Sequence, residues 1–196
     1  MEFDSADDAW QWLSSRLTTA EGYRPVPETF DNFEVKYGVR LPGGYRGFAS
    51  RFGAGILGRY FRIAVPEIPN GVTWFDLDKL NRHSVRACSA EWVEGVHCRG
   101  IPQQEVPGIV AQVRRLVFFA SLDAEEYIGW DPEDVRDSDA PEYGVYILPR
   151  CAPPVYCAHS FEQFVFDICL GDRFPEHIPT DREAWREDRE PYLWVY

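Results

Sequence analysis

The N-terminal part of the chain places hydrophobic residues with the period of an α-helix. Ser5 and Asp8 suit an N-terminal cap, and the apolar residues behind them predict a first helix that ends near Ala20. A second helix is predicted over 27–37, because three aromatic residues share one face and a glycine follows it. Pro42 then begins a third helix with a similar aromatic face.

After Gly58 the hydrophobic pattern changes to the alternation of β-strands. Strands are predicted over 59–65, 115–121, 126–131, 142–149, 154–158 and 192–196. Polar or Gly/Pro-rich turns separate the four strands between 115 and 158, and these turns are too short for crossover helices. The sheet is therefore expected to be antiparallel.

Further helices are expected around these strands. Thr73 is a candidate cap for a helix that reaches Leu80, and capping boxes begin at Ser160 and Thr180. Glycine and proline interrupt the segment 81–112, so we expect loops there, with one short helix or edge strand. This order predicts an α+β domain with helices packed mainly on one face of an antiparallel sheet.

The composition supports one large hydrophobic core. With 196 residues, of which 45% are hydrophobic, the chain is long enough to bury a core without disulfides. The side chains expected to be largely buried in it are Phe33, Tyr37, Leu41, Tyr45, Phe48, Phe52, Val117, Phe119, Tyr146, Phe161, Phe164 and Ile168.

The cysteines and the first residues favour a cytoplasmic protein. Five cysteines make an odd number, which is typical of free thiols in a reducing compartment. Residues 1–4 carry neither the basic nor the apolar region of a secretory signal, and no stretch approaches the roughly 20 apolar residues of a membrane span. We therefore expect cytoplasmic localisation.

Negative charge is concentrated in one part of the chain. The formal net charge is −12, and between Ser121 and Tyr143 nine acidic residues against one basic residue, Arg136, contribute −8 of it. Such a chain opposes nucleic acids and anionic membranes, since both are bound through Lys and Arg. A basic protein partner is favoured instead.

The acidic segment is the candidate binding site. We predict that its outward-facing acids bind a basic partner, with two aromatic residues as anchors. The predicted site residues are Trp130, Asp131, Glu133, Asp134, Asp137, Asp139 and Tyr143. The alternative is a solvated hairpin loop with Trp130 and Tyr143 in the core.

Three motifs in order resemble the SUKH superfamily, which includes the Smi/Knr cell-wall regulators of yeast. "FEVKYGVRLPGGYRGFASRFGAG" (33–55) resembles its helix–Leu-Pro–helix opening. "LVFFASLDAEEYIGWD" (116–131) resembles its apolar strand, acidic turn and aromatic strand. "VYCAHSFEQFVFDICLG" (155–171) resembles its closing strand and helix. On this basis 1–171 is predicted to be a SUKH-like domain, and 172–196 a C-terminal extension packed on the same domain.

The resemblance implies a function without catalysis. Bacterial members look chiefly like immunity proteins, which bind and neutralise toxin domains, often nucleases, of polymorphic or contact-dependent toxin systems. We therefore expect a non-enzymatic immunity protein with a basic toxin domain as its partner. The alternative is an intracellular regulatory or scaffold protein of the same fold with no toxin partner.

Other chemistry has weaker sequence support. The aspartates after Trp130 lack the order of an EF-hand loop. His97 and Cys98, together with Cys151, Cys157 and His159, lack the spacing of a structural zinc site. Cys157 and His159 share a strand face, but no orienting motif or oxyanion signature accompanies them. No cofactor, metal or catalytic residue is predicted.

Overall fold

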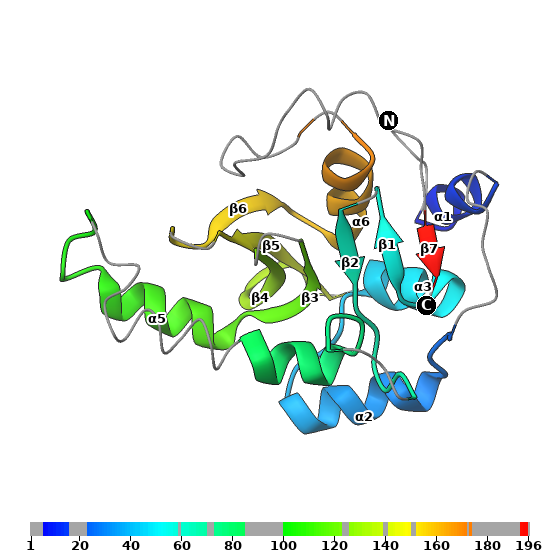
Figure 1. The fold of residues 1–196 in the computed structure, drawn as a ribbon, viewed down its shortest axis with the longest axis horizontal. Helices are drawn as coiled ribbons and strands as arrows, with labels where there is room; N and C mark the ends of the chain where they lie inside the picture. The colour runs from blue at the N-terminus through cyan, green and yellow to red at the C-terminus, as the bar shows by residue number, and fades with distance from the viewer. Residues whose placement is uncertain are drawn as a thin grey trace.

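A computed structural model describes most of the chain and shows an α+β fold (Figure 1). The described residues are 6–15, 23–58, 60–69, 73–84, 100–122, 126–138, 141–149, 152–171, 173 and 193–195. The helices are α1 (Ala6–Ser14), α2 (Pro27–Tyr37), α3 (Gly43–Phe52), α5 (Val106–Arg115), α6 (Phe161–Gln163) and the π-helix η1 (Phe164–Cys169), with a further helical segment at 77–84. The strands are β1 (Gly55–Leu57), β2 (Phe61–Ile63), β3 (Val117–Ser121), β4 (Tyr127–Asp137), β5 (Glu142–Leu148), β6 (Val155–Ala158) and β7 (Leu193–Val195).

The strands form one sheet in the order β6-β5-β4-β3-β2-β1-β7. Every neighbouring pair of these described strands is antiparallel, which confirms the predicted α+β fold with an antiparallel sheet. Strands β1 to β6 lie in chain order, and β7 returns to pair with β1. Since β7 lies within 172–196, the end of the predicted extension belongs to the same sheet. The domain boundary at 171 stays a prediction.

The sheet is covered on both faces at β3, where all five residues are buried. The Phe119 ring stacks on Trp130 of β4 at 4.9 Å between centroids and contacts Phe161 of α6 at 5.2 Å. The neighbouring Phe118 contacts a different ring, Tyr127, at 5.6 Å. We predicted that the helices lie mainly on one face of the sheet, and this stays a prediction.

Glycine ends both aromatic helices of the first motif. Gly38 follows α2 with φ 66°, and its N–H donates to the carbonyl oxygen of Glu34. Gly53 follows α3 with φ 74°, and a Cβ at this position would collide with the carbonyl oxygen of Tyr23. The positive φ favours glycine at both positions, and at Gly53 there is also no room for a Cβ, so both helices end where the sequence predicts.

Most of the predicted core is confirmed. Ten of the twelve residues are buried, and the exceptions, Tyr37 and Tyr146, are partly buried. Their hydroxyls donate to Asp78 at 2.7 Å and to Asp134 at 2.9 Å. A tyrosine in this position packs its ring inside and keeps its hydroxyl near the surface. Burial, together with the aspartate, raises the pKa of Tyr146 to about 12.

Three local elements differ from the sequence prediction. The helical segment at 77–84 is capped by Asp76, whose Oδ1 accepts from the Lys79 N–H at 2.9 Å, and not by Thr73. Helix α5 occupies 106–115, where mainly loops were expected, and the additional strand β1 precedes β2. The helix predicted behind Thr180 lies outside the described residues.

The Ser160 capping box begins the last helix of the third motif. The Gln163 N–H donates to Ser160 Oγ at 3.0 Å, while Gln163 Oε1 accepts from the N–H of His159 at 2.8 Å. The helix then widens from α6 into η1, which buries Phe164 and Ile168. The predicted cap is confirmed, although its return bond reaches one residue further than in a standard capping box.

Glu142, one of the nine acids of the negative segment, joins the N-termini of two helices. Its Oε1 accepts from the Gly44 N–H at 2.7 Å, and its Oε2 accepts from the Phe161 N–H at 3.3 Å. Burial raises the pKa of this carboxyl, although the two N–H donors act in the opposite direction. The carboxylate therefore ties α3 and α6 to the start of β5.

Replacing Glu142 by alanine is expected to lower the free energy of unfolding by about 2 kcal/mol, because two helix N-terminal N–H groups lose their acceptor. Glu162→Ala is the matched control, since this glutamate lies in α6, one of the two helices that Glu142 joins, and is partly exposed. Urea denaturation measures the free energy of unfolding of both variants. Equal losses in the two would contradict the role given to Glu142.

Candidate functional site

The acidic segment after Trp130 forms a wide bulge in β4 and not a hairpin loop. Trp130 pairs with Val145 and Val135 pairs with Tyr143, so four residues of β4, 131–134, lie opposite Gly144 alone. A Cβ on Gly144 would collide with the Asp134 carboxylate. Bulges commonly redirect side chains at functional sites, and this one directs the acids in several directions.

Asp131 fixes the start of the bulge from inside. The Arg115 guanidinium of α5 donates to both of its oxygens, Nε to Oδ1 and Nη2 to Oδ2, each at 2.8 Å. The Glu133 N–H also donates to Oδ1, at 3.1 Å. Asp131 is only 1% exposed. Because a buried carboxylate needs such partners, its role in the fold is the attachment of α5 to β4.

Asp134 fixes the other end of the bulge. Its Oδ2 accepts from the Tyr146 hydroxyl at 2.9 Å and from Arg136 Nη2 at 2.6 Å. The Arg136 guanidinium in turn lies 5.0 Å from the centre of the Tyr156 ring, in cation–π distance. The bulge is therefore attached at both ends, which makes it a rigid part of the surface.

The predicted aromatic anchors are in the core. Trp130 is fully buried against Phe119 and Tyr45, and Tyr143 is also buried. The prediction that both face a partner is therefore wrong for this structure, because the alternation of β4 and β5 directs them inward. The part of the alternative that places both rings in the core is confirmed, whereas residues 131–137 belong to β4 and not to a hairpin loop.

The acids that were predicted to face outward differ in their exposure to solvent. Glu133 and Asp137 are exposed, and Asp134 is partly buried. The prediction that Asp131 faces out is wrong, because Arg115 holds it inside. Asp139 lies outside the described residues. Two further acids of the segment, Glu126 and Glu142, are also withdrawn from the surface, so its formal charge overstates the charge that a partner meets.

Two apolar side chains at this end of the sheet are exposed, and the sequence prediction did not include either as a site residue. Val135 of β4 is 52% exposed and Tyr156 of the edge strand β6 is 45% exposed. The signal for Tyr156 was present, since it alternates with Val155 and Cys157 in a strand at the sheet edge. We call the exposed residues at this end of the sheet the hairpin surface: Glu133, Val135, Arg136, Asp137 and Tyr156. Arg136 lies against Tyr156, whereas Val135 pairs with Tyr143 and so points to the other face of β4.

Cys157 and His159 show little reactive character. The Cys157 thiol donates to the Val145 carbonyl oxygen at 3.4 Å, and burial raises its pKa, whereas a nucleophilic cysteine needs a lowered one. His159 is exposed next to the Ser160 cap. Of the cysteines in the described part of the chain, Cys157 and Cys169 are free thiols.

Metal ligands do not cluster among the residues that the structure describes: they contain no group of three or more His, Cys, Asp or Glu side chains suited to a metal ion. The Cys88, Cys98 and Cys151 thiols and His97 lie outside this part. Of the aspartates considered for calcium, Asp131 is held by Arg115 and Asp134 by Arg136.

Comparison with protein-family models, with curated proteins and with solved structures gives no match to this chain. Within the described ranges, no helix has both the length and the apolar character needed to cross a bilayer.

Proposed function

We propose that the protein is a non-enzymatic immunity protein of the SUKH type, which binds and neutralises a basic toxin domain in the cytoplasm. The three ordered motifs support this proposal. They occupy elements that pack on one another: α3, β3 with the start of β4, and α6 with η1. The motif residues therefore build the core, and specificity for a partner belongs to the surface between them.

The observation that carries the proposal is the hairpin surface. It begins directly after the second motif, and it combines exposed apolar groups, Val135 and Tyr156, with the exposed acids Glu133 and Asp137. Aromatic anchors with charged neighbours are typical of the residues that dominate protein–protein binding. The bonds of Asp131 and Asp134 hold this surface rigid, which lowers the entropic cost of binding.

Charge reversal at the hairpin surface is expected to slow association. In the variant Glu133→Lys/Asp137→Lys we expect the association rate to fall about tenfold at low salt and its salt dependence to flatten, because exposed acids act mainly by steering a basic partner. The partner is the chain captured from an extract of the producing cell, and the measurement is stopped-flow binding at low and high salt.

The matched control is Glu28→Lys/Glu105→Lys, which makes the same change in net charge at exposed acids outside the hairpin surface. If both double variants associate at the wild-type rate, the hairpin surface is not the binding site. A captured chain without toxin activity would favour the regulatory or scaffold alternative. Both comparisons require that the variants are folded. Near-ultraviolet circular dichroism measures whether their tertiary structure is unchanged.

A further inference from the structure

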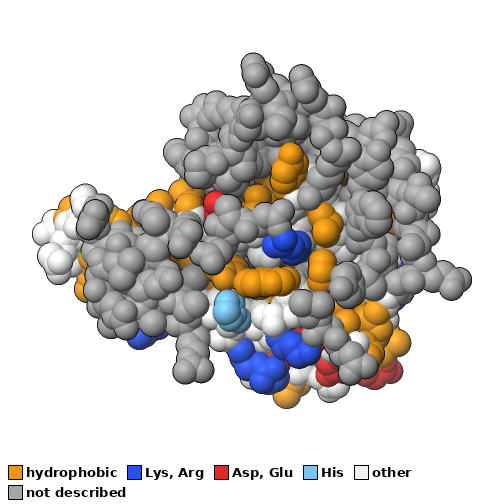
Figure 2. Space-filling view, viewed as in Figure 1, with side chains coloured by type: hydrophobic (Ala, Val, Ile, Leu, Met, Phe, Trp, Pro, Cys, Tyr) orange, Lys and Arg blue, Asp and Glu red, His pale blue; other side chains and the backbone are white. Residues whose placement is uncertain are grey.

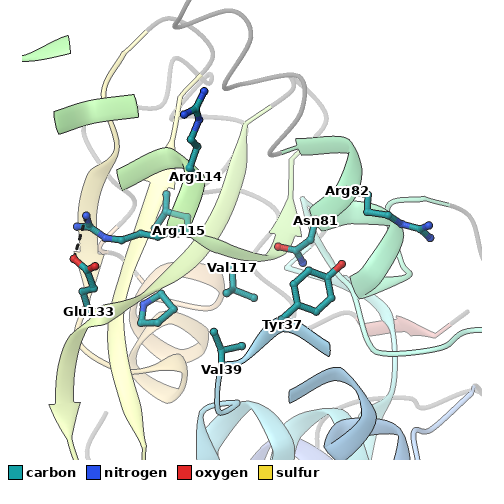
Figure 3. A pocket seen from close by; sticks show the side chains of 10 residues that line it. Tyr37, Val39, Asn81, Arg82, Arg114, Arg115, Val117 and Glu133 are labelled. Atoms are coloured by element: carbon teal, nitrogen blue, oxygen red, sulfur yellow. Dashed lines mark ion pairs between the residues drawn. The ribbon is translucent and has the colours of Figure 1, made fainter. Parts of the chain in front are cut away.

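A pocket of about 800 Å³ lies at the junction of α5 and β3 and borders the hairpin surface at Glu133 (Figure 3). Its apolar wall comes from four elements or their ends: Tyr37, Val39, Leu116, Val117 and Pro132. This volume is within the range of pockets that hold small organic molecules, roughly 300–1,000 Å³.

The pocket exists because β2 separates from β3. The last residue pair of these strands is Ile63 with Ala120, so Phe118 has no strand partner on that side. The Asn81 side chain takes the place of a strand: Nδ2 donates to the Phe118 carbonyl oxygen at 2.7 Å, and Oδ1 accepts from the Phe118 N–H at 2.8 Å. A side chain thus replaces a strand, and room remains beside it.

The polar atoms of the pocket wall are already engaged. Asn81 Nδ2 also donates to the Leu77 carbonyl oxygen at 2.7 Å, so both of its amide protons have acceptors. The Tyr37 hydroxyl donates to Asp78 Oδ1 at 2.7 Å. A ligand body in the pocket therefore meets apolar surface and saturated polar groups, which favours an apolar body.

Positive charge surrounds this apolar wall. Three arginines, Arg82, Arg114 and Arg115, line the pocket against one acid, Glu133, although the chain as a whole carries −12. Figure 3 shows the arginines around the outside of the pocket, and Figure 2 shows a few basic side chains near the lower edge of this face, with acidic ones beside them. Acids compensate two of these charges, since Arg82 pairs with Asp78 and Arg115 pairs with Asp131 and with Glu133.

The three arginines differ in their partners. Arg115 is held by Asp131, and Arg82 pairs with Asp78 at 2.6 Å. Arg114 is exposed and forms no ion pair with the part of the chain that the structure describes. A guanidinium in this state offers its donors to an anionic group at the edge of the pocket.

We propose that this pocket binds a small amphipathic carboxylate, with the apolar body against Val39 and Val117 and the carboxylate on Arg114. This proposal does not rest on the toxin-binding proposal, although Glu133 lies at the edge of both sites. The size of the pocket and its saturated polar wall fit this one class of ligand, as does Arg114 at its edge, which has no ion pair within the described ranges.

The test uses the fluorescent aromatic sulfonate 1-anilinonaphthalene-8-sulfonate as the probe, displaced by decanoate or by decyltrimethylammonium. The two competitors have the same chain length and opposite charge. We expect one probe site, with decanoate displacing the probe at about tenfold lower concentration than the cation does, the ratio expected for one charge-assisted hydrogen bond. Equal displacement by both competitors, or the absence of probe binding, would overturn the proposal.

Two substitutions in the pocket test whether the ligand binds there. Arg114→Glu is expected to weaken decanoate binding about tenfold and to strengthen binding of the cation, because the new carboxylate repels the first and attracts the second. Val39→Asp is expected to weaken both, because it places a charge against the apolar body. The controls are Arg24→Glu and Val35→Asp, which make the same changes at exposed positions outside the pocket. If Arg114→Glu and Arg24→Glu bind decanoate equally, the carboxylate does not bind at Arg114. Circular dichroism confirms that each variant is folded before titration.

Discussion

Replacing Phe48 by alanine is expected to lower the free energy of unfolding by about 4 kcal/mol. Phe48 of α3 is fully buried, and its ring contacts Trp10 at 5.6 Å, Phe52 at 4.9 Å and Phe161 at 5.4 Å between centroids. Truncation removes the ring from the place where α1, α3 and α6 meet, and rigid neighbouring rings close such a cavity poorly.

Urea denaturation measures this loss, with an unchanged m-value as the sign that the folded state is otherwise intact. Val35→Ala is the control, because Val35 is 84% exposed on α2 and its truncation should change stability by less than about 0.5 kcal/mol. A similar small loss for Phe48→Ala would show that the helices do not share this core.

Replacing Arg115 by alanine is expected to cost about 3 kcal/mol, the lower part of the range for breaking a buried ion pair. Asp131 would remain buried without the guanidinium that now donates to both of its oxygens. We expect a value near the lower end because the Arg115 side chain is 35% exposed, so water compensates in part.

Arg114→Ala is the matched control for this pair. Arg114 is adjacent on the same helix and is exposed, so its truncation should cost less than about 0.5 kcal/mol. In the double variant Arg115→Ala/Asp131→Ala the loss should be smaller than the sum of the two single losses, because no unpaired charge stays buried. Additive losses would mean that the two side chains do not interact.

The sequence predicted elements whose signals are local. The period of the aromatic residues and the glycine at position 38 placed α2 and its end, and the Ser160 box placed the start of α6. The alternation of apolar residues identified most of the sheet, and short turns made it antiparallel. Each of these features depends on residues within a few positions of one another.

The candidate site was predicted poorly because its state depends on distant partners. Whether Asp131 faces solvent is decided by Arg115, and whether Glu142 joins an acidic surface is decided by α3 and α6. A charge count along the chain treats these acids like Glu133 and Asp137. The wide bulge of β4 likewise depends on Gly144 of the next strand, and no local sequence pattern predicts the bulge.

The most direct test of the proposed function is capture of a partner from an extract of the producing cell on two immobilised baits, the wild-type chain and Val135→Asp/Tyr156→Ala. Both substituted side chains are exposed, so the bait should remain folded. We predict that the wild type retains one basic chain that carries a toxin domain, that it suppresses the activity of this chain, and that the variant bait loses it. Retention of the same chain by both baits, or a captured chain whose activity is unchanged by the protein, would contradict the account.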